Sequence, residues 1–244
     1  MKHHYVKTSN HRTFADAVTA LESRGSPEAC ILLLSGPPGT GKSCTVDNWG
    51  ASVDALTLEG IPGMNVSYVR DWLASQTGVV GKTRFEQYEA TVKWFRGRAG
   101  APIILDEAQH GLPEKAACIE YLRRLLEQAR RPDVYLVLVC HSTERHRFSE
   151  ARLAHIATRT SAAPQLQPAN VDDCALYLAE SCDIALAADI AHLVHKQSRG
   201  RYRLMANAVR MLEAIALAKG LKALTAADIK GETLCEDVLA EGRK

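Results

Sequence analysis

The sequence lacks the features that would place it in a membrane or an oxidising compartment. Its seven cysteines include no CxxC pair, and several lie in apolar runs, which excludes a disulfide or zinc framework and indicates buried, reduced thiols. No apolar run reaches the roughly 18 to 20 residues that span a bilayer. The N-terminal stretch MKHHYVKTSNHRTF has no apolar signal-peptide core. We therefore expect a cytoplasmic protein with no membrane partner.

The sequence also lacks a strong charge of either sign. Its net charge is +2, which neither requires nor excludes nucleic acid, so any basic surface must be local. The apolar and charged fractions, 46% and 24%, are those of an ordinary globular protein. With 244 residues the chain can bury a sizeable core, and it suits one α/β domain with a smaller domain appended.

Apolar runs alternate with helical patterns up to residue 168. The first helix is expected at about residues 13–23, with Thr13 as its N-cap. Further helices are expected at 66–76, 84–98 and 117–130. Strands are expected at 29–35, 54–60, 102–107 and 134–140, with a last short strand at 164–168. This alternation predicts an α/β fold with a parallel sheet sandwiched by helices.

The pattern changes after Pro168. The segments NVDDCALYLAESC, AADIAHLVHKQS, YRLMANAVRMLEAIALAKG and TAADIKGETLCEDVLA all have helical periodicity, and none resembles a strand. We expect an α/β domain over residues 1–168, of which 1–28 form a short N-terminal helical extension, and a helical domain over 169–244.

A glycine-rich loop follows the first predicted strand. It fits the pattern G-x-x-x-x-G-K-[ST] of a phosphate-binding P-loop, with the required strand before it and helix after it. Glycines let backbone N–H groups converge on phosphate oxygens, and the helix N-terminus adds a positive dipole end. Lys42 can reach the β and γ phosphates, and Ser43 can ligate Mg²⁺. The predicted ATP-binding residues are Gly36, Pro37, Pro38, Gly39, Thr40, Gly41, Lys42, Ser43 and Cys44.

A second motif, ILDEAQH, ends the strand predicted at 102–107. Asp106 stands where open α/β sheets place ligands and can hold Mg²⁺. Glu107 can orient and deprotonate a water aimed at the γ-phosphate. A helix N-terminus with acidic first-turn residues is the alternative. Because a kinase has no need of the second carboxylate, the pair points to ATP hydrolysis.

Two further polar groups are candidates for the reaction. If the strand at 134–140 lies between the P-loop strand and the strand at 102–107, Ser142 or His141 would face the γ-phosphate. The alternative is that both are simply polar residues where the chain leaves the strand. An arginine just before the last strand could serve a neighbouring subunit's nucleotide. The arginines in that segment are Arg145, Arg147, Arg152 and Arg159.

Together these motifs resemble the AAA+ ATPases over about residues 10 to 235. GPPGTGKS corresponds to Walker A and IILDEAQH to Walker B. The resemblance implies that Arg159 is the arginine finger, with Arg152 as a competitor, and that Arg203 is the lid sensor-2 arginine, with Arg201 as a competitor. It also implies that the helical domain is the lid.

Within the AAA+ proteins, the short N-terminal segment, the DEAQH motif and the compact lid resemble the phage transposition protein B (MuB-like) group and its TniB-like and TnsC-like relatives. The resemblance implies a bacterial or phage-infected cytoplasm, homo-oligomeric rings or filaments on duplex DNA, and stimulation of a DDE transposase. The chain has no room before the P-loop for the helix-turn-helix domain of the Mu protein, so we expect the ATPase domain itself to contact DNA.

One basic segment could make that contact, largely independently of sequence. The predicted residues are Lys82, Arg84, Arg96 and Arg98, and the alternative is that they are ordinary surface charges. Two other functions remain open. A DnaC-like or IstB-like helicase loader would prefer single-stranded DNA, and an ExeA-like secretion or signalling ATPase would show no DNA effect.

Overall fold

The computed structural model describes residues 2, 4–97, 101–131 and 133–236. The chain divides into two compact units. We name the first the sheet unit; it consists of Thr13–Gly36 and Lys42–Gln165. We name the second the helical unit; it consists of the described parts of Met1–Arg12, Pro37–Gly41 and Leu166–Lys244.

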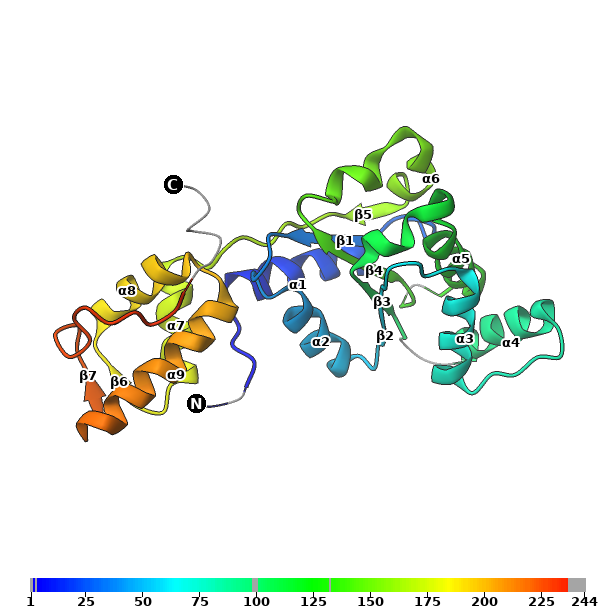
Figure 1. The fold of residues 1–244 in the computed structure, drawn as a ribbon. Helices are drawn as coiled ribbons and strands as arrows, with labels where there is room; N and C mark the ends of the chain where they lie inside the picture. Colours follow the sequence, from blue (N-terminus) through cyan, green and yellow to red (C-terminus); the bar gives the residue numbers. More distant parts are fainter. Residues whose placement is uncertain (1, 3, 98–100, 132, 237–244) are drawn as a thin grey trace. The chain divides into compact units, whose positions relative to one another are not determined.

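The sheet unit is built on a five-stranded parallel sheet with the strand order β2-β3-β4-β1-β5 (Figure 1). The two strands β1 and β4 are buried along almost their whole length, which explains why both are continuous apolar runs. The strands are β1 (Ile31–Gly36), β2 (Leu56–Glu59), β3 (Ile103–Asp106), β4 (Leu136–His141) and β5 (Thr160–Ala162). The predicted α/β fold is confirmed, and β4 lies between β3 and β1, the order on which the candidacy of His141 and Ser142 depends.

Helices connect these strands. Along the chain, α3 and α4 both follow β2 and precede β3, and α5 connects β3 to β4. The helices are α1 (Ser9–Glu22), α2 (Lys42–Ser52), α3 (Val66–Thr77), α4 (Arg84–Gly97), α5 (Pro113–Ala129) and α6 (Ala154–Ala157), with short 3-10 turns at Ala108–Gly111, Arg145–Ser149 and Ala151–Leu153.

Two predicted boundaries in this part of the chain are wrong. Helix α1 begins at Ser9, so Thr13 lies inside it; the carboxylate of Asp173 accepts hydrogen bonds from the backbone N–H and the hydroxyl of Ser9, a cap that no local pattern reveals. The last strand is 160–162 rather than 164–168. Pro164 has no N–H to donate to a ladder, and only a Ser35–Gln165 bridge continues the pairing.

The helical unit packs three helices around its own apolar core (Figure 1). They are α7 (Val171–Ser181), α8 (Ala188–Ser198) and α9 (Tyr202–Lys219). Contrary to expectation, the unit contains a two-residue strand pair, β6 (Ala185–Leu186) with β7 (Ala223–Leu224). The predicted fourth helix is also wrong over its described part: the chain turns at Gly231, where φ is 84°, and places Ile229 and Leu234 in the core.

The cysteines are free thiols, and five of the seven are buried as expected. The prediction of burial is wrong for Cys44, which is exposed on α2, and only partly correct for Cys235, which is half-buried. Over the ranges that the structure describes, no helix combines the length and the apolar character needed to cross a membrane.

Candidate active site

The lysine of the P-loop is held at the C-terminal end of β1. The Lys42 side chain is 8% exposed, and its Nζ donates a hydrogen bond of 2.8 Å to the carbonyl of Gly36. The backbone N–H of Ser142 donates to the same carbonyl at 3.1 Å. Burial lowers the pKa of Lys42, while the charges of Glu107 and Asp106 oppose that shift. The lysine is therefore held at the edge of the sheet where β3 ends in Asp106.

The loop backbone depends on glycine at two positions. Gly39 has φ of 84° and Gly41 has φ of 82°, in the left-handed region that side chains disfavour. A Cβ placed on Gly39 would lie 3.1 Å from the Cβ of Arg201. The carbonyl of Gly39 accepts a 2.9 Å hydrogen bond from the N–H of Tyr202, the first residue of α9. Within the helical unit, the loop and the start of α9 are thus in direct contact.

Asn10 is a supporting residue that sequence reasoning missed. Its side chain is buried, and its Nδ2 donates to the carbonyls of Thr40 at 3.1 Å and Gln167 at 2.8 Å. Its Oδ1 accepts from the N–H of Gln167 at 3.1 Å. Its partners lie 30 and 157 residues away in the sequence, so no local motif could have identified it.

The second motif has an unusual backbone. Asp106 ends β3, and its Oδ1 accepts a 2.8 Å hydrogen bond from the N–H of Glu107. Glu107 adopts φ 49° and ψ 43°, a left-handed conformation that costs about 1 to 3 kcal/mol and concentrates at functional sites. The N–H of Gly60 donates to the Asp106 carbonyl at 2.8 Å, and a Cβ on Gly60 would lie 2.5 Å from the Glu107 carbonyl oxygen. The segment after β2 therefore fixes the turn that presents Glu107.

Two side chains contact the Glu107 carboxylate. Gln109 Nε2 donates a hydrogen bond to Oε2, and His141 Nε2 lies 3.5 Å from the same oxygen. The β1–β4 register pairs Gly36 with His141, which brings this imidazole to the edge of the sheet that carries the P-loop lysine. Of the two candidates His141 and Ser142, His141 is thus the one whose side chain contacts Glu107. Ser142 lines a cavity together with Arg145, Phe148 and Thr160.

The oxygen atoms available on α2 and β3 fit a magnesium ion. Ser43 is exposed at the start of α2, and Asp47 lies one helical turn later on the same face. Burial raises the pKa of Asp47, and the like charge of Asp106 raises it further. The described residues include no cluster of three or more His, Cys, Asp or Glu that could hold a metal alone. Magnesium commonly takes few protein oxygens and completes its shell with phosphate and water, so a hydroxyl from Ser43 and a carboxylate from Asp106 would match its chemistry.

The predicted arginines lie in different environments. Arg159 precedes β5, and its backbone carbonyl accepts a 3.0 Å hydrogen bond from the N–H of Ile31 at the start of β1. Its competitor Arg152 has a side chain that is 64% exposed and lies 2.6 Å from Glu150. In the helical unit, Arg203 is exposed on α9, whereas the side chain of Arg201 lies against Gly39.

The predicted DNA-contacting residues are only partly available to a ligand. Lys82 and Arg84 are exposed at the connection between α3 and α4. The guanidinium of Arg96 is exposed but donates two hydrogen bonds, at 3.1 and 2.8 Å, to the carbonyl of Gln128 near the end of α5. Arg98 lies outside the described residues.

Comparison with solved structures supports the same fold. The chain is 16% identical to Cdc6p from Pyrobaculum aerophilum, with a TM-score of 0.66 over 94% of this chain and 68% of that one. It is 15% identical to the ORC2 protein of Aeropyrum pernix in ADPNP-ADP complexes, with a TM-score of 0.69 over 93% and 68%. It is 16% identical to RuvB of Thermotoga maritima, a Holliday junction branch migration motor, with a TM-score of 0.59 over 91% and 67%.

Sequence comparison places the P-loop and the second motif in one family. A search of curated protein sequences found no match. Residues 27–148, half of the chain, match a family model described as an AAA domain. This segment runs from just before β1 to the turn after β4 and includes Lys42, Glu107 and His141. The chain therefore belongs to the AAA domain family.

Proposed function

We propose that this protein hydrolyses ATP to ADP and phosphate. The observation that carries the proposal is that Lys42, bonded to the Gly36 carbonyl at the end of β1, lies at the same edge of the sheet as Asp106 and Glu107 at the end of β3. The fold likeness to a protein determined with ADPNP and ADP supports nucleotide binding. Kinase activity is less well supported, because a kinase has no need of a second carboxylate. Here Gln109, His141 and a left-handed backbone all hold that carboxylate, Glu107, at this edge.

Each candidate residue has a separate role in this reaction. The Lys42 ammonium and the loop N–H groups bind the phosphates, and the left-handed turn at Glu107 presents its carboxylate as the base for a water. Gln109 and His141 orient that carboxylate. A magnesium ion held by Ser43 and Asp106 would neutralise phosphate charge.

We further propose that ATP promotes assembly of a homo-oligomer, a ring or a filament, on duplex DNA, and that the partner is a transposase. The transposition part of the proposal depends on the resemblance of the GPPGTGKS and DEAQH motifs to the transposition ATPases. The fold likeness to a Holliday junction motor supports an association with DNA. Lys82 and Arg84, both exposed, are the proposed phosphate contacts.

Fluorescence anisotropy with labelled duplex DNA tests the DNA part of this proposal. We expect tight, salt-sensitive binding with ATP and weak binding with ADP or without nucleotide, accompanied by rings or filaments in negative-stain images. Preference for single-stranded DNA would favour a helicase loader. Equal or absent binding in all three nucleotide states would contradict a DNA switch and leave an ATPase with a protein client.

Charge reversal tests the two proposed phosphate-binding residues. The double substitution Lys82→Glu and Arg84→Glu should weaken binding and make the slope of log affinity against log salt less negative by about 0.9 for each phosphate that the protein no longer neutralises. Lys93→Glu is the control, because Lys93 is an exposed lysine on α4 that is not one of the two proposed phosphate contacts. Equal effects of the two changes would contradict the assignment.

A further inference from the structure

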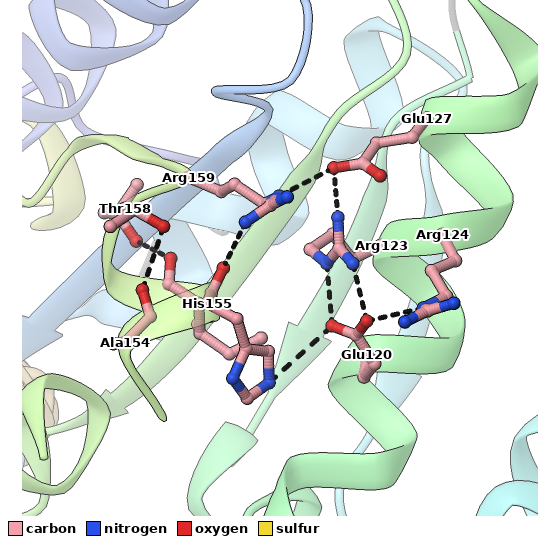
Figure 2. A network of polar contacts seen from close by, with 10 residues as sticks. Glu120, Arg123, Arg124, Glu127, Ala154, His155, Thr158 and Arg159 are labelled. Atoms are coloured by element: carbon pink, nitrogen blue, oxygen red, sulfur yellow. Dashed lines mark hydrogen bonds and ion pairs between the residues drawn. The ribbon is translucent and has the colours of Figure 1, made fainter. Parts of the chain in front are cut away.

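A network of charged side chains joins α5 to the residues before β5 (Figure 2). At its centre is Arg123, which is 4% exposed and bridges two glutamates on its own helix. One is Glu120, which Arg123 contacts through Nε at 2.8 Å and through Nη2 at 2.5 Å. The other is Glu127, which accepts from Nη1 of Arg123. Because Glu127 is held by a buried cation, its carboxylate has a fixed position.

Arg159 is the outer member of this network. Its Nε donates to Glu127 Oε1 at 3.0 Å, and its Nη1 donates to the carbonyl of His155 at 3.1 Å. Nη2 makes no hydrogen bond to any residue that the structure describes, and the side chain is 28% exposed. Two contacts therefore fix the plane of the guanidinium and leave one nitrogen available (Figure 2).

The network carries a net positive charge, which Arg159 can present to a phosphate. Three arginines (Arg123, Arg124 and Arg159) face two glutamates (Glu120 and Glu127), so one positive charge is uncompensated. His155 Nε2 lies 3.7 Å from Glu120 and can only add to the positive charge. Since Arg123 already neutralises Glu127, the contact with Glu127 orients Arg159 without cancelling its charge.

Arg159 cannot serve the nucleotide of its own sheet unit. Its backbone pairs with Ile31 at the start of β1, whereas Lys42 binds the carbonyl of Gly36 at the other end of that strand. At about 3.3 Å per residue, β1 is roughly 16 Å long. Arg159 and Glu127 lie at the N-terminal edge of the sheet, at the end of α5. Any phosphate that Arg159 contacts must belong to another copy of the chain.

We propose that Glu127 is a positioning residue for Arg159, held in turn by Arg123, so that the guanidinium meets the nucleotide phosphate of a neighbouring copy in a preset orientation. The inference rests on the proposed function, because only in a homo-oligomer that hydrolyses ATP can Arg159 of one copy reach the nucleotide of the next. A positioned arginine finger is worth roughly 10³ to 10⁵ in rate in nucleotide hydrolases. Misplacement of a catalytic group by about 1 Å can cost on the order of 10²-fold.

Mixed oligomers separate the effect of Glu127 on the supplied arginine from any effect on the site that hydrolyses ATP. Donor protomers carry Glu107→Gln, so they contribute an arginine but do not hydrolyse ATP. Acceptor protomers carry Arg159→Ala, so they hydrolyse ATP only where a donor supplies the arginine. Adding Glu127→Ala to the donors should lower kcat of the mixture by about tenfold to a hundredfold, with KM for ATP unchanged.

Two further donor variants separate position from charge. Glu127→Asp keeps the charge but shortens the side chain by one methylene, and it should also lower kcat. Glu127→Gln keeps the length and an oxygen acceptor for Arg159 Nε, and it should recover most of the loss. Glu89→Ala, at an exposed glutamate on α4, is the matched control and should have no effect. Thermal melting and ATP binding of each donor verify that it is folded.

The outcomes distinguish the inference from the proposed function beneath it. A loss of kcat with Ala and Asp, and recovery with Gln, would support the positioning role. Equal kcat with all folded donors would overturn it while leaving the shared site intact. Absence of activity when simple Glu107→Gln donors are mixed with Arg159→Ala acceptors would overturn the inference and the trans role of Arg159, because no site would be shared. Wild-type turnover, measured in parallel, tests the proposed ATP hydrolysis separately.

Discussion

The Nε2 atom of His141 lies 3.5 Å from the Oε2 atom of Glu107, at the ends of the adjacent strands β4 and β3. Gln109 contacts the same carboxylate oxygen. Within the ranges that the structure describes, His141 Nδ1 and Gln109 Oε1 are buried with no hydrogen-bond partner. Buried polar atoms usually have hydrogen-bond partners, so these two atoms single out the surroundings of Glu107 for testing.

Replacing Glu107 by Gln should separate nucleotide binding from hydrolysis. The amide cannot accept a proton from water, so we expect turnover to fall by about 10² to 10⁴-fold while ATP still binds. The proposed DNA-bound assembly should also persist longer. Phosphate release and ATP titration measure the two effects, with Glu89→Gln as the control. Turnover unchanged in the variant would exclude Glu107 as the base.

Lys42→Ala should abolish ATP binding and DNA-bound assembly together. The substitution removes the ammonium group that is bonded to the Gly36 carbonyl at the end of β1. Isothermal titration with ATP and anisotropy with duplex DNA measure the two effects, and Lys93→Ala is the control. If the variant keeps wild-type affinity for ATP, the P-loop assignment is wrong.

Gly60→Ala should impair hydrolysis although Gly60 carries no side chain. Its new Cβ would lie 2.5 Å from the carbonyl oxygen of Glu107 and 3.0 Å from that of Asp106, and these backbone atoms must move. We expect lower turnover and a decrease of about 1 to 3 kcal/mol in the free energy of unfolding. Gly25→Ala is the matched control, because a Cβ at Gly25 would meet no atom within 4 Å. Similar results for the two variants would show that the close packing at Gly60 is unimportant.

Glu120 should make stability depend on pH in the acidic range. Burial alone would raise the pKa of Glu120, but hydrogen bonds from Arg123 and Arg124 lower it from 4.5 to about 2. A carboxyl whose pKa is depressed by folding stabilises the protein above its unfolded pKa and loses that effect as pH falls toward the folded value. The stabilisation is therefore complete above pH 4.5 and is lost between pH 4.5 and about pH 2.

Urea unfolding of wild type and Glu120→Gln across this range measures the effect. The variant should be less stable at pH 7, and the difference in unfolding free energy should shrink as pH falls below 4.5. Glu89→Gln should follow the wild type at every pH. A difference for Glu120→Gln that stays constant from pH 7 to pH 3 would contradict the assigned pKa.

Some helices and strands could be predicted from the sequence and others could not, for physical reasons. β1, β3 and β4 were predictable because strands covered on both faces must be continuously apolar. The start of α1 was not, because its cap is Asp173, which is 164 residues away. The prediction of the final helix failed because periodicity shows which residues are apolar, whereas Ile229 and Leu234 reach the core from non-helical backbone.

The sequence by itself determined the P-loop, the acidic pair Asp106 and Glu107, and the α/β class, because each depends on residues close together in the chain. Only the tertiary structure decided that His141 rather than Ser142 contacts Glu107, that Asn10 supports the loop carbonyl of Thr40, and that Glu127 holds Arg159. These contacts join separate elements, and their geometry depends on strand order, register and helix packing. Local patterns predict which chemical groups are present, and packing sets which of them meet.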